Sequence, residues 1–202
     1  SRELPEGSSG YDLAKDIGPG LAKSAVAVSV DGVQRDLHDV IEGDASVSII
    51  TIDSDQGIEI MRHTLTAQVL ARAIKNLYPK SKLAIGPTID DGFYYDVESE
   101  KSISSDDLSK IEDEMKKIIK TKSSITKKLV SKSEALKVFK ENKESYKEII
   151  VNESKQKDNF QLYYQDDKKF VDLCRGPHLP NLEFIGSFKL TKVSGAYWKG
   201  DS

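Results

Sequence analysis

Cysteine is scarce in this sequence: Cys174 is the only one among 202 residues. A single cysteine cannot form a disulfide within the chain, which fits a reducing compartment and leaves its thiol free for packing or chemistry. Long apolar runs are also lacking, and the first residues carry neither the basic nor the apolar region of a signal peptide. We therefore expect a cytoplasmic protein without a membrane span.

An excess of positive charge is lacking as well, because the formal net charge is -3. The chain as a whole therefore has no electrostatic preference for nucleic acid. The charge is uneven, however, and lysines outnumber acidic residues between Lys116 and Lys147. This stretch favours a pair of solvated helix faces, although a surface that meets a phosphate backbone would have the same pattern.

The residues that are present describe a folded protein, with 38% hydrophobic and 31% charged side chains. A chain of this length can form one ordinary domain or two small ones. The polar segment 53–57 is the best boundary, since the apolar pattern behind it changes to the period of a helix. We expect one domain over residues 1–56 and a second over residues 57–202.

The first domain begins with a short helix. Ser9 can cap it, Leu13, Ala14 and Ile17 would face inward, and Gly18 would supply a left-handed stop. Next, Asp31-Gly32 predicts a hairpin turn between two strands, and a third strand follows over 45–52. We expect a small α+β unit with one helix across a mixed sheet, from which an edge-forming first strand is missing.

The second domain also reads as α+β. It begins with a helix whose apolar residues include Met61, Leu65 and Val69, followed by two strands around Asp91-Gly92. An amphipathic helix then buries one face, and Ser131 with Glu134 forms the capping-box pattern of another helix. The apolar face of the amphipathic helix comprises Leu108, Ile111, Met115 and Ile118. Three strands are expected in the tail, over residues 160–164, 169–173 and 187–193.

The segment VDLCRGPHLP, Val171–Pro180, places Cys174 four residues before His178. The two could act as nucleophile and base, as two metal ligands, or as groups that orient water. A buried thiol before a Gly-Pro turn would give the same pattern. Zinc would need a third and usually a fourth ligand, and only His63 is a plausible further imidazole.

Motifs along the whole chain, in order, resemble the N-terminal half of bacterial threonyl-tRNA synthetases. The most specific are DLCRGPH and GFYYD; the others are IGPGLAK, IEIMRH, AIGPTIDDGFYYDV, ESYK and GAYWKGD. The resemblance implies a ubiquitin-like TGS domain of β-grasp fold over 1–56, and an editing domain of the threonyl/alanyl-tRNA synthetase type over 57–202.

The resemblance also implies what these residues do not contain. The aminoacylation domain, with its ATP, magnesium and zinc, would follow Ser202, so no cofactor is expected here. The expected partner is the acceptor end of threonine tRNA carrying a mischarged seryl ester. We expect this piece of the ligase to be monomeric, the full enzyme to be a homodimer, and the activity to be ester hydrolysis rather than aminoacylation.

A synthetase that accepts threonine cannot strongly reject serine, because the loss of one methyl group changes binding by only about 1–3 kcal/mol. The resemblance implies that the editing domain hydrolyses the seryl ester instead. Cys174 and His178 fall on the family's C-x-x-x-H motif, and Asp172 on an acid that binds the seryl amino group. Lys147 matches a lysine that holds or activates water, and Tyr95 a tyrosine that lines the pocket.

The family's first motif, an H-x-x-x-H pair on the first helix, is altered. Aligning the residues after it puts Thr64 and Gln68 in place of the two histidines, whereas aligning those before it makes His63 the first. The helix therefore has a one-residue insertion, which a π-bulge could absorb. We hypothesise that His63 turns back into the pocket and that Gln68 replaces the second imidazole, with no metal bound.

Two other hypotheses remain open. His63 could be an ordinary polar residue at a helix start, and this half of the pocket could have decayed. The chain would then be a non-catalytic module that binds the tRNA acceptor arm through its lysines. In the second of these hypotheses, the first domain only positions the second domain or binds another partner.

Overall fold

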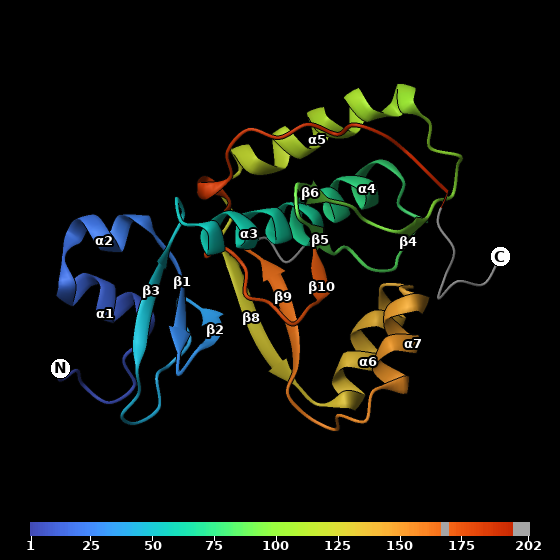
Figure 1. Cartoon of the computed structure of the whole chain (residues 1–202). Coiled ribbons are helices and arrows are strands. Elements are labelled where there is room, and N and C mark those ends of the chain that lie inside the picture. Colours follow the sequence, from blue (N-terminus) through green and yellow to red (C-terminus); the bar gives the residue numbers. More distant parts are fainter. Residues whose placement is uncertain (167–169, 196–202) are drawn as a thin grey trace.

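The computed structural model describes residues 1–166 and 170–195. Its N-terminal unit, residues 1–56, contains an antiparallel sheet of strand order β2-β1-β3 with two helices packed beside it (Figure 1). The elements are α1 (Gly10–Ile17), α2 (Pro19–Ser24), β1 (Ala25–Val30), β2 (Val33–Asp36) and β3 (Val47–Thr51). Asp31 and Gly32 turn the predicted hairpin with φ values of 50° and 82°, which is the positive-φ geometry of tight hairpins.

Four expectations for this unit are wrong. The sheet is antiparallel rather than mixed in the described residues, and two helices accompany it. Gly18 is extended, with φ 167°, because it joins α1 directly to α2 instead of ending one helix in the left-handed region. Ile17 is 44% exposed, whereas Ala14 is buried against Ala25.

One long helix begins at Asp55, two residues before the boundary predicted at residue 57, and opens the C-terminal unit that follows this boundary. Its parts are α3 (Asp55–Thr64), η1 (Leu65–Leu70) and α4 (Ala71–Leu77), and the backbone stays helical through both joints. The segment η1 is a π-helix, the wider turn that a one-residue insertion produces. The predicted π-bulge is therefore confirmed, and it lies directly after His63 and Thr64.

A three-stranded antiparallel sheet, in the order β10-β9-β8, lies against this helix. The strands are β8 (Ile125–Val130), β9 (Phe160–Gln165) and β10 (Val171–Leu173). The predicted amphipathic helix is α5 (Leu108–Lys120), which follows the short turn η2 (Ser105–Asp107) and lies over the long helix (Figure 1). Ile111 and Met115 of α5 share one core with Leu65, Val69 and Tyr163.

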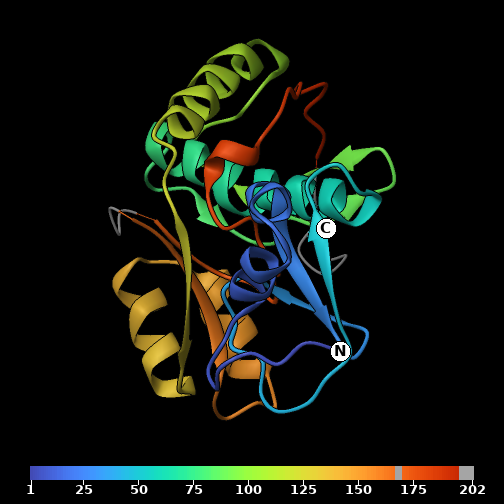
Figure 2. The same cartoon turned by 90° about the vertical axis from the view of Figure 1, so that its left-hand side faces the viewer.

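The other face of the sheet is covered by α6 (Lys132–Glu141) and α7 (Ser145–Glu153), which lie on the opposite side from α5 (Figure 2). Alternation along β9 produces this division, because Leu162 packs with Phe139 of α6 while Tyr163 packs with the long helix. Ser131 accepts a hydrogen bond from the backbone N–H of Glu134, which is one half of the predicted capping box.

Short strands connect the long helix to α5. They are β4 (Lys82–Leu83), β5 (Thr88–Ile89), β6 (Gly92–Phe93) and β7 (Val97–Glu98), with a final turn η3 (Leu182–Phe184) later in the chain. The β5–β6 hairpin turns at Asp90 and Asp91, and Gly92 already pairs with Ile89. The turn predicted at Asp91-Gly92 is therefore shifted by one residue.

Two further expectations are corrected. Residues 187–193 form no strand; they run along α5, where Glu112 holds them through the Leu190 N–H at 2.8 Å (Figure 1). The lysine-rich stretch is a pair of solvated helix faces only in part: most lysines of α5 and α6 are exposed, but β8 lies between the two helices and Lys147 is only 4% exposed. Of the predicted turn at 165–169, residues 167–169 lie outside the described residues.

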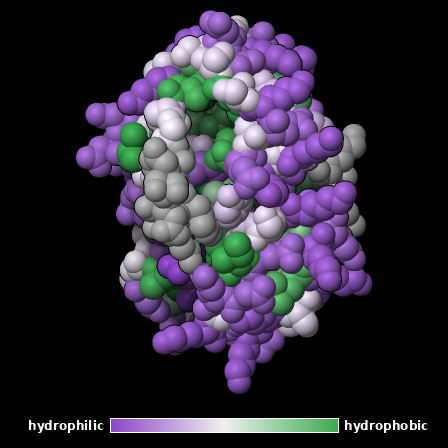
Figure 3. Space-filling view, turned by 90° about the vertical axis from the view of Figure 1, so that its right-hand side faces the viewer, coloured by the Kyte–Doolittle hydropathy of each residue, from purple (hydrophilic) through white to green (hydrophobic). Residues whose placement is uncertain are grey.

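The two units share a core. Ile60 of α3 and Leu179 pack with Val26, Ala27 and Ile50 of the first sheet. Among the described residues, no helix combines the length and apolar character that a membrane span requires. The coloured part of the face in Figure 3 is mostly hydrophilic. The α+β class predicted from the sequence is confirmed.

The contact between Glu112 and the segment 187–193 can be tested directly. Replacing Glu112 with Ala leaves the Leu190 N–H without its acceptor, which we expect to cost about 1–3 kcal/mol of unfolding free energy. Trypsin should then cleave sooner after Lys189 and Lys192, as mass spectrometry would show. Asp113→Ala is the matched control, because this exposed carboxylate pairs with Lys116 and with no other side chain in the described part of the chain. Equal cleavage in both variants would refute the role of Glu112.

Candidate functional site

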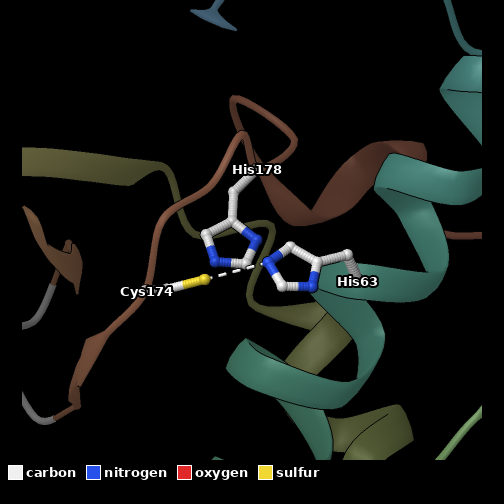
Figure 4. Close-up of side chains that lie close together, drawn as sticks. All are labelled: His63, Cys174 and His178. Atoms are coloured by element: carbon white, nitrogen blue, oxygen red, sulfur yellow. Dashed lines mark hydrogen bonds between the residues drawn. The ribbon is translucent and has the colours of Figure 1, made fainter. Parts of the chain in front are cut away.

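His63, Cys174 and His178 meet at the end of α3 (Figure 4). The helix supplies His63, and the loop after β10 supplies the other two side chains. The Nε2 atom of His63 lies 2.9 Å from the Cys174 Sγ. The two imidazole rings stack with centroids 4.6 Å apart and planes inclined by 7°. His63 lies one residue before the end of α3, so its interpretation as a residue at a helix start is wrong.

The loop is shaped by Gly176 and Pro177, which are joined by a cis peptide bond. The Gly176 N–H points back to the Cys174 Sγ at 3.3 Å. A Cβ on Gly176 would lie 2.0 Å from the hydroxyl oxygen of Tyr163, and φ is 66° there, so glycine is required on both counts. The loop thereby brings the chain back to α3, and His178 is only 2% exposed.

Thr64 holds His178 from the helix side. Its Oγ1 lies 2.9 Å from the Ile60 carbonyl oxygen, 3.1 Å from the Nδ1 atom of His178, and 3.0 Å from the Leu179 nitrogen. When the hydroxyl donates to Ile60, it accepts from both others, which places the imidazole proton on Nδ1. The Nε2 atom of His178 then carries a lone pair, and this buried atom has no hydrogen-bond partner among the described residues.

A second cluster lies beside the first. Lys147 of α7 forms a 2.8 Å ion pair with Asp172 of β10, and the two side chains are 5% and 3% exposed. The Tyr95 hydroxyl donates to Asp172 at 3.4 Å, and the lysine ammonium lies 5.7 Å from the centre of the Tyr95 ring. Asp172 and Cys174 are two residues apart in extended chain, so their side chains point to the same side.

Burial acts differently on the ionisable groups of the two clusters. Burial disfavours the ammonium of Lys147, but Asp172 and Tyr95 outweigh it and raise its pKa. Burial raises the pKa of Asp172, and the ion pair with Lys147 opposes that shift. Burial likewise raises the pKa of the Cys174 thiol to about 12. Lys147 therefore keeps its proton at neutral pH, and Cys174 is a neutral thiol rather than a thiolate nucleophile.

Burial lowers the pKa of both histidines in the first cluster. The effect is larger for His178, whose pKa lies well below 6.5 because of burial and the neighbouring His63. Both imidazoles are therefore neutral at pH 7. A neutral imidazole with a free Nε2 lone pair can accept a proton from water.

Gln68 lies in a different network. Its backbone carbonyl and side-chain oxygen accept from the Gln165 amide at 2.9 and 3.3 Å, and Arg72 donates to the Gln165 oxygen at 2.5 Å. Within residues 1–166 and 170–195, no hydrogen bond joins Gln68 to His63, Cys174 or His178. Its Nε2 atom is buried without a partner in the same part of the chain, so the idea that it replaces an imidazole stays a prediction.

The structure adds residues that the sequence analysis missed. The edge of the Tyr163 ring meets the His178 imidazole at 4.6 Å and 88°, and Asp36 of β2 accepts from the His178 backbone N–H at 2.9 Å. A cleft of about 450 Å³ between the two units is bordered by both residues and by His178 and Lys127. No spacing in the sequence links Asp36 to this loop, since 142 residues separate it from His178.

The first cluster also contains three potential metal ligands. One ligand atom from each of His63, Cys174 and His178 lies within 4.8 Å of the other two. Tetrahedral zinc would take a fourth ligand, which could be water in an open site, and it would bind the cysteine as a thiolate. The expectation that no metal binds here stays a prediction.

Comparison with known proteins supplies a context for this geometry. Residues 1–51 match the family model of the TGS domain, and residues 161–202 match that of the threonyl and alanyl tRNA synthetase second additional domain. A threonine–tRNA ligase of Hahella chejuensis is 45% identical over 201 residues. That alignment covers 100% of this chain and 31% of the length of the relative.

The buried histidines predict how stability depends on pH. Below the ordinary pKa of 6.5, the unfolded chain binds a proton that folded His178 does not, so stability should fall as pH falls. Between pH 7.5 and 5.5 we expect His178 to contribute about 1 kcal/mol of this loss. Denaturant unfolding should therefore show a weaker pH dependence in His178→Gln. His38→Gln, which changes an exposed histidine, is the control, and an equal reduction there would contradict the prediction.

Proposed function

We propose, on the premise that the chain comprises the TGS domain and the editing-type domain of a threonyl-tRNA synthetase, that its pocket hydrolyses seryl esters of threonine tRNA. A synthetic site that accepts threonine gains only about 1–3 kcal/mol of discrimination against the smaller serine. A second site that removes serine after transfer is the physical remedy.

The observation that supports hydrolysis most is the buried ion pair of Lys147 and Asp172. Asp172 lies two residues before Cys174 in the chain, and therefore close to the cluster that holds the Nε2 atom of His178, which has no partner among the described residues. A buried ion pair is seldom the most stabilising choice for a core. Here Asp172 is followed two residues later by Cys174, a partly exposed thiol that contacts the neutral imidazole of His63, so one stretch of chain connects donors, acceptors and an imidazole. Such a set can bind an amino acid ester and activate water.

Each residue has a role that follows from its charge state. Asp172 accepts from the seryl ammonium group, and Tyr95 lines the pocket and keeps the carboxylate oriented. Lys147 donates hydrogen bonds to the ester carbonyl oxygen as negative charge develops there. Cys174 remains a thiol that orients water together with His63, whose Nε2 lies 2.9 Å from its sulfur.

The reaction is the addition of water to an ester. Water attacks the ester carbonyl carbon while the Nε2 atom of His178 takes its proton, and the carbonyl oxygen becomes an oxyanion beside Lys147. When the carbonyl reforms, the bond to the terminal ribose oxygen breaks, and that oxygen takes the proton from His178. The products are free serine and uncharged tRNA, so all atoms balance.

No step of this scheme requires a metal ion. The protein itself supplies the proton acceptor, through His178, and the donor to the oxyanion, through Lys147. Thr64 acts by fixing the imidazole, because its Oγ1 contacts the Nδ1 atom. We assign to Gln68 a supporting role, in which its contacts with Gln165 hold the wide turn of the helix beside the sheet.

The central test uses seryl-tRNA and threonyl-tRNA, both prepared on threonine tRNA. We expect the chain to release serine selectively, and the double variant Cys174→Ala, His178→Ala to release neither amino acid above the buffer rate. Chelator-treated protein should keep its activity. A full-length synthetase carrying the same residues is assayed in parallel, because other domains contribute to tRNA binding.

Two results would contradict the proposal. If the full-length enzyme leaves seryl-tRNA intact while binding tRNA in a salt-dependent way, the domain is a binding module. If activity disappears with the chelator and returns with zinc, the proposed metal-free scheme is wrong.

The role of Lys147 gives a separate prediction. Lys147→Met removes the donor to the oxyanion and should lower kcat for seryl ester hydrolysis by about 10²–10³-fold. Because the change leaves Asp172 buried and unpaired, the double variant Lys147→Met, Asp172→Asn is measured beside it. Lys155→Met, at an exposed position, is the control for general charge effects. Normal kcat in a folded double variant would exclude the assigned role.

A further inference from the structure

We propose that Asp36 of the N-terminal unit is a positioning residue for the hydrolytic pocket of the C-terminal unit, because it holds the loop that carries His178. The inference rests on the proposed function and extends it, since it makes the TGS unit a structural part of the editing site. The residue lies at the end of β2 and its side chain is 15% exposed.

Both carboxylate oxygens of Asp36 are used by the other unit. Oδ1 accepts from the His178 backbone N–H at 2.9 Å, and Oδ2 accepts from the Tyr163 hydroxyl at 2.8 Å. Lys127 of β8 forms an ion pair with Oδ2 at 3.1 Å. One carboxylate therefore joins the loop, β9 and β8, and hydrogen bonds to an ionised group are the stronger kind.

The loop needs a partner of this type. Pro177 has no N–H, and the Gly176 N–H is directed to the Cys174 sulfur. The first backbone donor after the turn is therefore that of His178, and it points to the first unit. Thr64 contacts the imidazole of the same residue. His178 is thus fixed at its backbone by one unit and at its ring by the other.

Asp36 also acts on His178 through Tyr163. The hydroxyl that donates to Asp36 belongs to the ring whose edge meets the His178 imidazole. The same hydroxyl fills the space beside Gly176 that a Cβ would otherwise occupy. Loss of the carboxylate would free the tyrosine and the backbone of the loop together. The His63 ring stacks on the His178 imidazole and contacts Cys174, so a displacement of His178 would reach both side chains.

Asp39 provides a control that distinguishes a positioning role for Asp36 from a contact that only holds the two units together. Asp39 pairs with the same Lys127, at 2.5 Å. In the described residues it makes no hydrogen bond to the loop, to Tyr163 or to His178. Changing Asp39 weakens the charge contact between the units but spares the loop, whereas changing Asp36 affects both.

The experiment compares Asp36→Ala, Asp36→Asn and Asp39→Ala in the full-length synthetase and in this chain. We expect kcat for seryl ester hydrolysis to fall about tenfold or more in Asp36→Ala, with KM nearly unchanged, because small displacements of a catalytic group reduce rate rather than binding. Asp36→Asn keeps an oxygen that can accept from His178 and should lose less. Asp39→Ala should stay within about twofold of the unchanged protein.

Two measurements test the inference without relying on hydrolysis. The chain has a single cysteine, so the pH dependence of its alkylation reports only on Cys174. Its three histidines allow the imidazole nitrogen signals of His178 to be assigned by NMR after His38→Gln and His63→Gln. We expect Asp36→Ala to shift the alkylation profile and the His178 signals, and Asp39→Ala to leave both in place.

The outcomes are distinct. Equal losses in Asp36→Ala and Asp39→Ala, or none in either, would overturn the positioning role. If the unchanged protein hydrolyses no ester, the proposed function fails, while the alkylation profile and the His178 signals still decide the inference. Should Asp36→Ala not fold, Asp36→Asn is compared with Asp39→Ala by the same measurements.

Discussion

The pocket depends on an ion pair in an interior that would be more easily filled with apolar groups. Lys147 and Asp172 are almost fully buried, and neither could stay there without the other. A second buried contact supports the first: Glu144, just before α7, pairs with Lys75 of α4 at 2.6 Å and accepts the Leu83 N–H at 2.9 Å. Glu144 thereby ties the start of α7 to α4 and to the strand β4.

Local signals in the sequence foretold much of the fold. Asp31-Gly32, the apolar face of α5, and the caps at Ser9 and Ser131 act over a few residues, and each is found as expected. Predictions that depended on contacts between residues far apart in the sequence were less accurate. The segment 187–193 alternates like a strand, but it pairs with no strand among the residues that the structure describes, and its Leu190 N–H is bound by Glu112 of α5. The strand β8 was missed, since its lysines hid its pairing with β9.

The site shows the same division. Cys174, His178, Asp172 and Lys147 were expected from motifs. The structure brings Cys174 and His178 together with His63, and it pairs Lys147 with Asp172. His63 was placed by an argument about insertion, which the π-helix supports. Asp36 could not be inferred in this way, because its link to His178 joins two units far apart in sequence. A contact between residues far apart in the sequence produces no periodic pattern in the sequence.

The wide turn at Leu65–Leu70 divides one continuous helix into two halves that pack against different neighbours. The half before it presents His63 to the pocket and Ile60 to the first sheet; the half after it presents Ala73 and Ile74 to the main core. A turn that has already taken up one extra residue lets the first half rotate relative to the second. The width of this turn therefore sets the direction in which His63 faces, while Leu65 and Val69 of the turn itself belong to the main core.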